Sequence, residues 1–382
     1  MLTQNALAHA IAARRDSGAI LLDLTETNPT AAGFSYPPDV LSSLGHPRAG
    51  RYAPDPRGLV VGREAVAAEY AGVAGAPQPS AIVLTASTSE AYALLFKLLC
   101  DPDDEVLIPQ PGYPLFEWLT GLEAVQARAY SLEYHGTWSI ARESLEATLT
   151  PRTRAVLVVT PNNPTGSRLR EGDREWLAAW CAERGLALIS DEVFADYILS
   201  ARSDAASLVG ETRTLTFVLG GLSKSAGLPQ VKLAWIIVSG PADLAGEALA
   251  RMEVISDTYL SVSTPVQAAA PELLAAGRIV RRQIQARLIR NLGSLRAVVP
   301  AHPAVTLLEP EGGWSVVLRV PATRSEEALA IDLLESAGVV VHPGYFFDFA
   351  HGAFLVLSLL TDPATFDEGV GRILAAIANQ GR

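Results

Sequence analysis

From about residue 80 the sequence alternates short apolar, β-branched runs with segments of helical period. The runs at 81–85 and 154–160 (AIVLT and RAVLVVT) are typical of strands, and the segments at 89–99 and 171–184 repeat their apolar residues like helices. This alternation predicts an α/β fold with a mostly parallel central sheet covered by helices on both faces. Because ligands of such sheets bind at the carboxyl ends of the strands, polar residues there are the first candidates for a site.

The pattern changes after about residue 275. A long arginine-rich helix is predicted at 278–299, and short apolar runs follow at 314–320, 338–344 and 354–360. Strands and helices at this density favour a smaller α+β domain. For the 382 residues we therefore predict an N-terminal segment that contributes to the small domain (1–45), a large domain (46–275) and a C-terminal small domain (276–382).

Composition excludes several classes of function. Hydrophobic residues make up 49% and charged residues 19%, as in a globular enzyme. The net charge of -11 and the lack of a basic run argue against nucleic acid as a partner. No apolar stretch reaches the length of a membrane span, and the first 20 residues lack a secretory pattern, so we expect a cytoplasmic protein. Cys100 and Cys181 have no metal-ligand spacing, which predicts buried, reduced thiols and no metal site.

Lysine is used sparingly. Only three of the 30 basic residues are lysines, and two of these, Lys224 and Lys232, lie in the stretch LSKSAGLPQVKLAW at 222–235. Where a positive charge is enough, this chain uses arginine, so a lysine here indicates a need for a primary amine.

Polar loops follow one predicted strand after another, and in this order they closely resemble the class I/II aminotransferases, fold-type I enzymes that use pyridoxal 5'-phosphate (PLP). The resemblance extends from RYAPDPRGL at 51–59 to VVVHPGYFF at 339–347. It implies the fold-type I architecture, PLP as cofactor, and a homodimer with shared active sites. The loops that carry it read TASTSEA at 85–91, PQPGYP at 109–114, TPNNPTG at 160–166 and SDEVFADY at 190–197, together with the lysine stretch.

The resemblance assigns roles to four residues of these loops. Lys224 corresponds to the lysine that forms a Schiff base with PLP and then moves protons; a solvated lysine after a strand is the alternative. Asp191 corresponds to the aspartate that keeps the pyridine nitrogen protonated; the alternative is a helix N-cap. Asn163 matches the asparagine that donates to the phenolic oxygen of the ring, where Pro164 and its neighbours alone would predict only a turn. Tyr113 matches the aromatic ring that stacks on the pyridine, or it is an ordinary loop tyrosine.

Four further residues match the phosphate site. Ser87 and Thr88 begin a predicted helix, where they can donate hydroxyl hydrogen bonds to the phosphate or simply cap the helix. Lys232 stands where the family usually has an arginine that contacts the phosphate, and it supplies charge without a bidentate fork. Tyr52 resembles the tyrosine that reaches the phosphate of the neighbouring subunit.

Two positions near the cofactor depart from the family pattern. Phe194 stands where the family usually has a tyrosine that donates to the phenolic oxygen, so one hydrogen bond to that oxygen is lost. Gly221 replaces a serine that many members use for the phosphate, and Ser223 or Ser225 can compensate.

The largest departure concerns the substrate. The resemblance aligns Val356 with the arginine that holds the substrate carboxylate, so a bidentate clamp is missing. Either another arginine, such as Arg319, takes this role, or the substrate is not a standard α-amino acid. Asn28, in a loop that resembles the one closing over substrate, either contacts the substrate or forms an Asn-Pro turn.

Three functions remain open from the sequence. The leading one is a PLP-dependent aminotransferase that moves an amino group from an amino acid or other amine to a 2-oxo acid. A β-eliminating C–S lyase of the same fold shares Lys224, Asp191 and Asn163, so the motifs do not separate the two. A non-catalytic PLP-binding sensor normally carries an additional DNA-binding domain, and the acidic charge argues against it.

Overall fold

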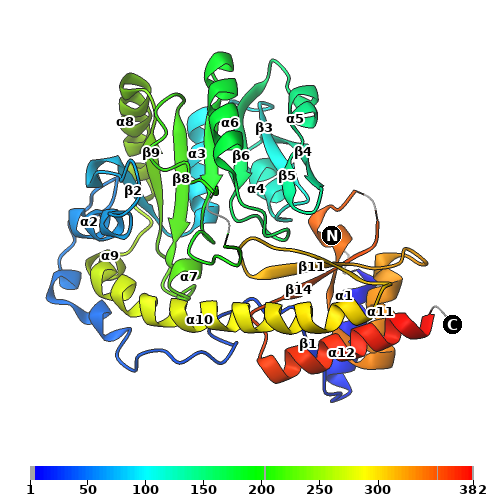
Figure 1. Ribbon diagram of the computed structural model, residues 1–382. Helices are drawn as coiled ribbons and strands as arrows, with labels where there is room; N and C mark the ends of the chain where they lie inside the picture. Colours follow the sequence, from blue (N-terminus) through cyan, green and yellow to red (C-terminus); the bar gives the residue numbers. More distant parts are fainter. Residues whose placement is uncertain (1–4, 202–203, 351, 381–382) are drawn as a thin grey trace.

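An eight-stranded sheet forms the centre of the larger part of the molecule (Figure 1). The computed structural model describes residues 5–201, 204–350 and 352–380. The sheet order is β2-β9-β8-β7-β6-β3-β4-β5, in which only β9 and β5 run antiparallel to their neighbours. The predicted mostly parallel sheet is thus confirmed. The strands are β2 (Ile82–Thr85), β3 (Glu105–Gln110), β4 (Gln126–Tyr134), β5 (Trp138–Ile140), β6 (Thr153–Val159), β7 (Ala187–Asp191), β8 (Thr216–Gly221) and β9 (Ala234–Ser239).

Helices cover both faces of this sheet because its central strands are apolar on both sides. Alternate residues of each strand belong to different apolar clusters: Val156 packs with α2, α5 and α6, whereas Leu157 packs with α3, α4 and α8. The start of α10 joins the first cluster. The helices are α2 (Val60–Glu69), α3 (Thr88–Leu99), α4 (Phe116–Leu122), α5 (Arg142–Thr148), α6 (Glu171–Arg184), α7 (Leu222–Ser225), α8 (Ala242–Tyr259), α9 (Thr264–Ala268) and α10 (Ala270–Val298).

The remaining elements form a smaller lobe with its own apolar core. Its antiparallel sheet has the order β10-β11-β14-β13, and β1 pairs in parallel with β12, which ties the N-terminal segment to this lobe. The predicted division into domains and its bounds stay a prediction. The elements are α1 (Ala6–Asp16), β1 (Leu22–Asp23), β10 (Thr306–Leu308), β11 (Ser315–Arg319), α11 (Glu326–Ala337), β12 (Val339–Val340), β13 (His342–Pro343), β14 (Phe354–Ser358) and α12 (Pro363–Gln380).

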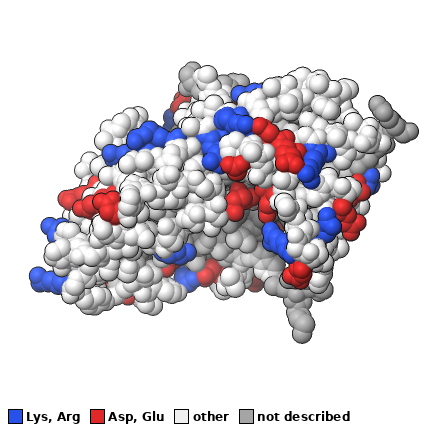
Figure 2. Space-filling model, turned by 90° about the horizontal axis from the view of Figure 1, so that it is seen from below, with Lys and Arg blue, Asp and Glu red and all other residues white. Residues whose placement is uncertain are grey.

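Helix α10 connects the two parts (Figure 1). Its 29 residues span about 44 Å, from α2 and α7 at one end to α12 at the other. The predicted domain boundary at residue 275 therefore falls inside this helix. Its arginines pair with acids along its length: Arg278 with Glu69, Arg281 with Asp196, Arg290 with Asp367, and Arg296 with Glu309. On the face shown in Figure 2, charges of both signs are accordingly interspersed.

Neither Cys100 nor Cys181 has the solvent exposure that is typical of a reactive cysteine. Cys181 is buried and Cys100 is partly buried, and burial raises the pKa of the Cys100 thiol to about 12. In the described part of the chain, no helix combines the length and apolarity needed to cross a membrane.

Candidate active site

The predicted residues gather at one edge of the large sheet. Strands β2, β3, β6, β7 and β8 all run in the same direction, so their carboxyl ends meet there. Strand β9 runs the other way, and its first residue, Ala234, pairs with Thr85 at the end of β2, so the preceding Lys232 belongs to the same edge. The residues that follow or end these strands are Ser87, Thr88, Tyr113, Asn163, Asp191, Phe194, Ser223 and Lys224.

Asp191 is a buried carboxylate at the end of β7. It is 8% exposed, and it accepts hydrogen bonds from the Tyr92 hydroxyl (2.7 Å) and the Val193 N–H (3.1 Å). Burial raises the pKa of this carboxyl, while the hydrogen bonds and the charge of Lys224 act in the opposite direction. Residues 193–196 form a turn, so the alternative of a helix cap is not realised. A buried carboxylate whose charged form is disfavoured by burial is most stable beside a cation.

Lys224 lies in the short helix α7, directly after β8. Its Nζ atom is 4.8 Å from the centre of the Trp314 ring and 5.6 Å from that of Phe194. Burial lowers the pKa of the amine, and the charge of Asp191 opposes this shift. A lowered pKa increases the fraction of neutral amine, which is the nucleophilic and basic form. The alternative of a solvated lysine does not describe this position.

The backbone around Lys224 is held from two sides. The Tyr197 hydroxyl donates to the Lys224 carbonyl (2.6 Å), and the Arg281 Nε donates to the Ser225 carbonyl (2.7 Å). The Ser225 hydroxyl donates to the Gly221 carbonyl (3.0 Å), so of the two serines considered as compensation for Gly221, Ser225 is already engaged. Ser223 is the one left to face a ligand.

Asn163 meets the small lobe. The Ser315 hydroxyl, at the start of β11, donates to the Asn163 Oδ1 (3.2 Å), which leaves the amide N–H groups of Asn163 to donate elsewhere. Phe194 is buried beside Trp314, with ring centres 5.3 Å apart in an edge-to-face contact. This position therefore contributes apolar surface and no hydroxyl.

Ser87 caps helix α3. Its hydroxyl oxygen accepts from the Glu90 N–H (3.1 Å), and the Glu90 carboxylate accepts from the Ala86 N–H (2.6 Å), a local variant of a capping box. The capping alternative is thus realised, while the hydroxyl proton of Ser87 stays available for an anion at the helix N-terminus. Thr88 is the first residue of this helix, and Lys232 is exposed, with a backbone φ of 60°.

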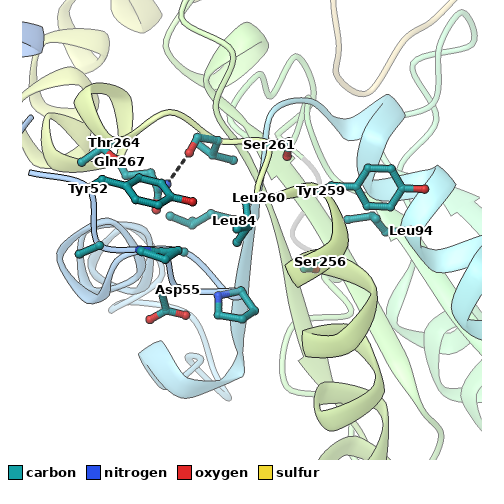
Figure 3. A pocket seen from close by; sticks show the side chains of 15 residues that line it. Tyr52, Asp55, Leu84, Leu94, Ser256, Tyr259, Leu260, Ser261, Thr264 and Gln267 are labelled. Atoms are coloured by element: carbon teal, nitrogen blue, oxygen red, sulfur yellow. Dashed lines mark hydrogen bonds between the residues drawn. The ribbon is translucent and has the colours of Figure 1, made fainter.

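Tyr113 lies 38% exposed in the loop after β3, with its ring edge against Phe116. Burial raises the pKa of the Tyr113 hydroxyl, and the negative charge of Asp191 adds to this shift. Tyr52 is different: it is 73% exposed and borders a surface pocket formed with α8 and α9 (Figure 3). In the single chain, Tyr52 is not joined to the residues above by any described contact.

The predicted substrate residues make no described contact with the residues above. Asn28 is exposed, and its Oδ1 accepts from the Thr30 N–H (3.0 Å) and hydroxyl (2.7 Å), so it forms the turn that was its alternative. Arg319 is exposed and lies four residues from Ser315 on β11, about 13 Å farther along the strand. This distance from the contact with Asn163 argues against Arg319 as the substrate clamp. Val356, on β14, is 2% exposed.

Sequence reasoning missed three side chains of this site: Tyr92, Trp314 and Ser315. A tyrosine among the apolar positions of the helix at 89–99 was a usable signal for Tyr92, because a buried phenol needs a hydrogen-bond partner. Trp314 and Ser315 follow a glycine pair in the sequence, but their contacts with Lys224 and Asn163 join distant parts of the chain. No local pattern reports such contacts.

Comparison with known proteins agrees with this geometry. The sequence profile of aminotransferase class I and II matches residues 36–373. The chain belongs to this family. Among relatives of this aminotransferase, the alanine aminotransferase of Mycobacterium tuberculosis is 27% identical, with 96% of this chain and 89% of the relative covered. The glutamate–pyruvate aminotransferase AlaA of Haemophilus influenzae is 25% identical, with 86% and 83% covered.

The solved structures show the same fold. The alanine aminotransferase of Pyrococcus furiosus superimposes with a TM-score of 0.87 at 21% identity, and 98% of both chains is covered. The fold-type I architecture predicted for this aminotransferase is thus confirmed. Enzymes of this class work with PLP, and the donor set described above fits that cofactor: a buried carboxylate that needs a cation, an amine of lowered pKa, and a capped helix N-terminus for an anion.

Proposed function

We propose that this aminotransferase holds PLP covalently through Lys224 and transfers an amino group from an amine donor to a 2-oxo acid. The observation that carries the proposal is that Asp191 and Lys224 follow neighbouring strands, β7 and β8, at the same edge of the sheet, where the charge of each opposes the pKa shift that burial causes in the other. One group is an acid that burial leaves in need of a cation, and the other is an amine that burial keeps reactive. This combination of an ion partner and a nucleophile is what the cofactor requires.

Asp191 supplies the charge at the far end of the site. The Tyr92 hydroxyl and the Val193 N–H each donate to one of its oxygens, so the carboxylate is oriented before a ligand arrives. A protonated pyridine nitrogen is the cation that this carboxylate would stabilise. When bound, PLP provides an electron sink for the carbanion that forms at the substrate carbon.

Lys224 moves the proton. Its free amine lies over the rings of Trp314 and Phe194, which limit the access of water to Nζ. In this environment the neutral amine is favoured, so Lys224 can take a proton from the substrate carbon as a general base and return it as an acid. The hydrogen bonds from Tyr197 and Arg281 to the backbone keep Nζ in position through both steps.

We further propose that two chains form a homodimer, in which Tyr52 of each reaches the phosphate of the other. The high exposure of Tyr52 in the single chain supports this, as do Tyr259 and Leu260, two exposed apolar residues beside the same pocket (Figure 3). Ser87, Thr88, Ser223 and Lys232 would bind the phosphate from within the chain. Asn163 would donate to the phenolic oxygen, and Tyr113 would stack on the ring.

The proposed function is tested by measuring the first half-reaction alone, in which the donor passes its amino group to the cofactor. The purified yellow protein is mixed with a pool of L-amino acids and primary amines, without any oxo acid, and the cofactor is then identified by chromatography. Stoichiometric pyridoxamine phosphate is expected. Ammonia and an oxo acid, with the cofactor recovered as PLP, would instead identify a β-eliminating lyase.

A further inference from the structure

One face of the small-lobe sheet is turned toward the active site. On β11, Val316 and Leu318 belong to the core of the small lobe, so Ser315 and Val317 point the other way. Ser315 reaches Asn163. Next to the site, a second contact joins the lobes, since the Gly112 N–H, beside Tyr113, donates to the Phe347 carbonyl (3.0 Å). We call this face, which lies next to Asn163 and the loop after β3, the wall of the small lobe.

The side chains of this wall follow from the strand register. Directly opposite residues of antiparallel strands share a face, so Ser315 lies beside Ser358, and the next row is Leu308, Val317, Val356 and His342. Val317 and Val356 pack with Trp138 and Phe347 in one buried apolar cluster between the lobes. Burial lowers the pKa of His342, which favours its neutral form at pH 7. The first two rows thus hold two serines, aliphatic groups and an imidazole; the Ser358 hydroxyl donates to the Glu26 carbonyl, so Ser315 supplies the hydroxyl that reaches Asn163.

Three arginines of the described residues were considered for this role: Arg281 and Arg287 are engaged, and Arg319 lies farther along its strand. Arg281 pairs with Asp196 (3.0 Å) and Glu69 (3.3 Å), and Arg287 donates to the carbonyls of Ala32 and Leu360. Arg319 belongs to the third row, at the exposed end of β11. A substrate carboxylate against the second row would lie unpaired on a buried apolar surface, which is costly.

We propose, on the basis of the function proposed above, that this wall receives an uncharged group, and that the enzyme accepts primary amines with an apolar substituent as readily as amino acids. In the half-reaction, the donor carbon would be oxidised to an aldehyde while its amino group and two electrons pass to the cofactor. Oxygen of the aldehyde comes from water, and no other oxidant is needed. Val356 is then the residue that sets this preference.

The first experiment measures binding without turnover. Calorimetry of the PLP-loaded protein compares 3-phenylpropionate with 3-phenylpropanamide, two unreactive ligands that differ mainly in charge. We expect wild type to bind the amide at least as tightly as the carboxylate. We expect Val356→Arg to reverse the order by about 10- to 100-fold, because an arginine–carboxylate pair is strong and directional. Val356→Leu, the matched apolar control, should keep the order of wild type.

The second experiment separates this inference from the proposed function. Conversion of 2-phenylethylamine and of L-phenylalanine is followed in single turnover through the loss of PLP absorbance. Rates within about tenfold of each other support the inference. The inference is overturned if wild type prefers L-phenylalanine in rate, or 3-phenylpropionate in binding, by more than about 100-fold. The proposed function then stays intact. Failure of every amine and amino acid to convert the cofactor overturns the proposed function, and the inference with it.

Discussion

The two walls of the active site differ in chemistry. The edge of the large sheet carries a buried carboxylate and an amine, Asp191 and Lys224, whose pKa values are shifted by burial and by each other. The facing wall of the small lobe carries Ser315, Val317 and Val356, which have no charge. The groups proposed to react are thus on one side, and the three residues proposed to select a substrate carry no charge.

This difference teaches that the chemistry and the choice of substrate are built separately. Chemistry depends on residues at the ends of parallel strands, where the sheet itself brings them together. Selection depends on the register of a second sheet and on how the lobes meet, through the hydrogen bond of Ser315 to Asn163. A chain can therefore keep the first wall while the second changes.

The largest effect is expected for Lys224→Arg. Arginine stays protonated and is a poor nucleophile, so we expect the half-reaction to fall by at least about 10³-fold and the absorbance of the covalent cofactor to disappear. Lys97→Arg is the matched control, because Lys97 pairs with Glu123 on the surface. A Lys224→Arg protein that keeps wild-type turnover would remove Lys224 from the reaction.

Asp191→Asn should reduce the half-reaction by about 10²- to 10³-fold, because an amide does not hold the pyridine nitrogen protonated. The same substitution should increase the thermal stability of the cofactor-free protein. Burial raises the pKa of Asp191, so the cofactor-free wild type loses stability as pH rises above about 4, the ordinary value for an aspartate. The Tm difference in favour of Asp191→Asn should grow from pH 4 toward pH 7.

The control for this variant is Glu192→Gln. Glu192 is also buried, yet three groups donate to it: the Ser190 and Ser207 hydroxyls and the Leu208 N–H. The Glu192→Gln variant should change the thermal stability and leave the rate of the half-reaction near that of wild type. Equal losses of activity in both variants would show that any change at the end of β7 disturbs the site.

Phe194→Tyr changes the edge of the large sheet by adding a hydroxyl, while Asp191 and Lys224 stay in place. A tyrosine would add a donor to the phenolic oxygen of bound PLP, so the pKa read from the absorbance titration of the PLP-loaded protein should fall by about one unit. Phe194→Leu removes the ring and adds no hydroxyl, so it should not lower this pKa. An equal or higher pKa in Phe194→Tyr would contradict the expectation.

The smallest effect is expected at the junction of the two walls. Ser315→Ala removes the hydrogen bond to Asn163, which is worth about 1 kcal/mol, so the half-reaction rate constant should fall about fivefold. Ser315→Thr keeps the hydroxyl and should restore most of the loss. If both variants behave alike, the hydroxyl of Ser315 does not orient Asn163.

Much of the first wall could be predicted from the sequence because each of its residues follows a recognisable strand. Asp191 ends an apolar run, and Lys224 is one of only three lysines. The predicted ends of the strands differ from the observed ends by only a few residues, because the apolar runs that form the strands are recognisable in the sequence. Tyr92, Trp314 and Ser315 were missed because their partners lie 99, 90 and 152 positions away in the chain: Asp191, Lys224 and Asn163, respectively.

The sequence by itself determined the fold class and the family and led to the proposed reacting groups, because hydrophobic period and strand-end motifs are local properties of the chain. The tertiary structure alone decided which alternatives hold: Asn28 forms a turn, Ser87 caps a helix, and Arg319 lies at the far end of its strand. It also decided which side chains share the small-lobe wall that we propose to face the substrate. Whether a valine faces a ligand depends on which strands pair and in what register, and these long-range contacts have no signal within a short stretch of sequence.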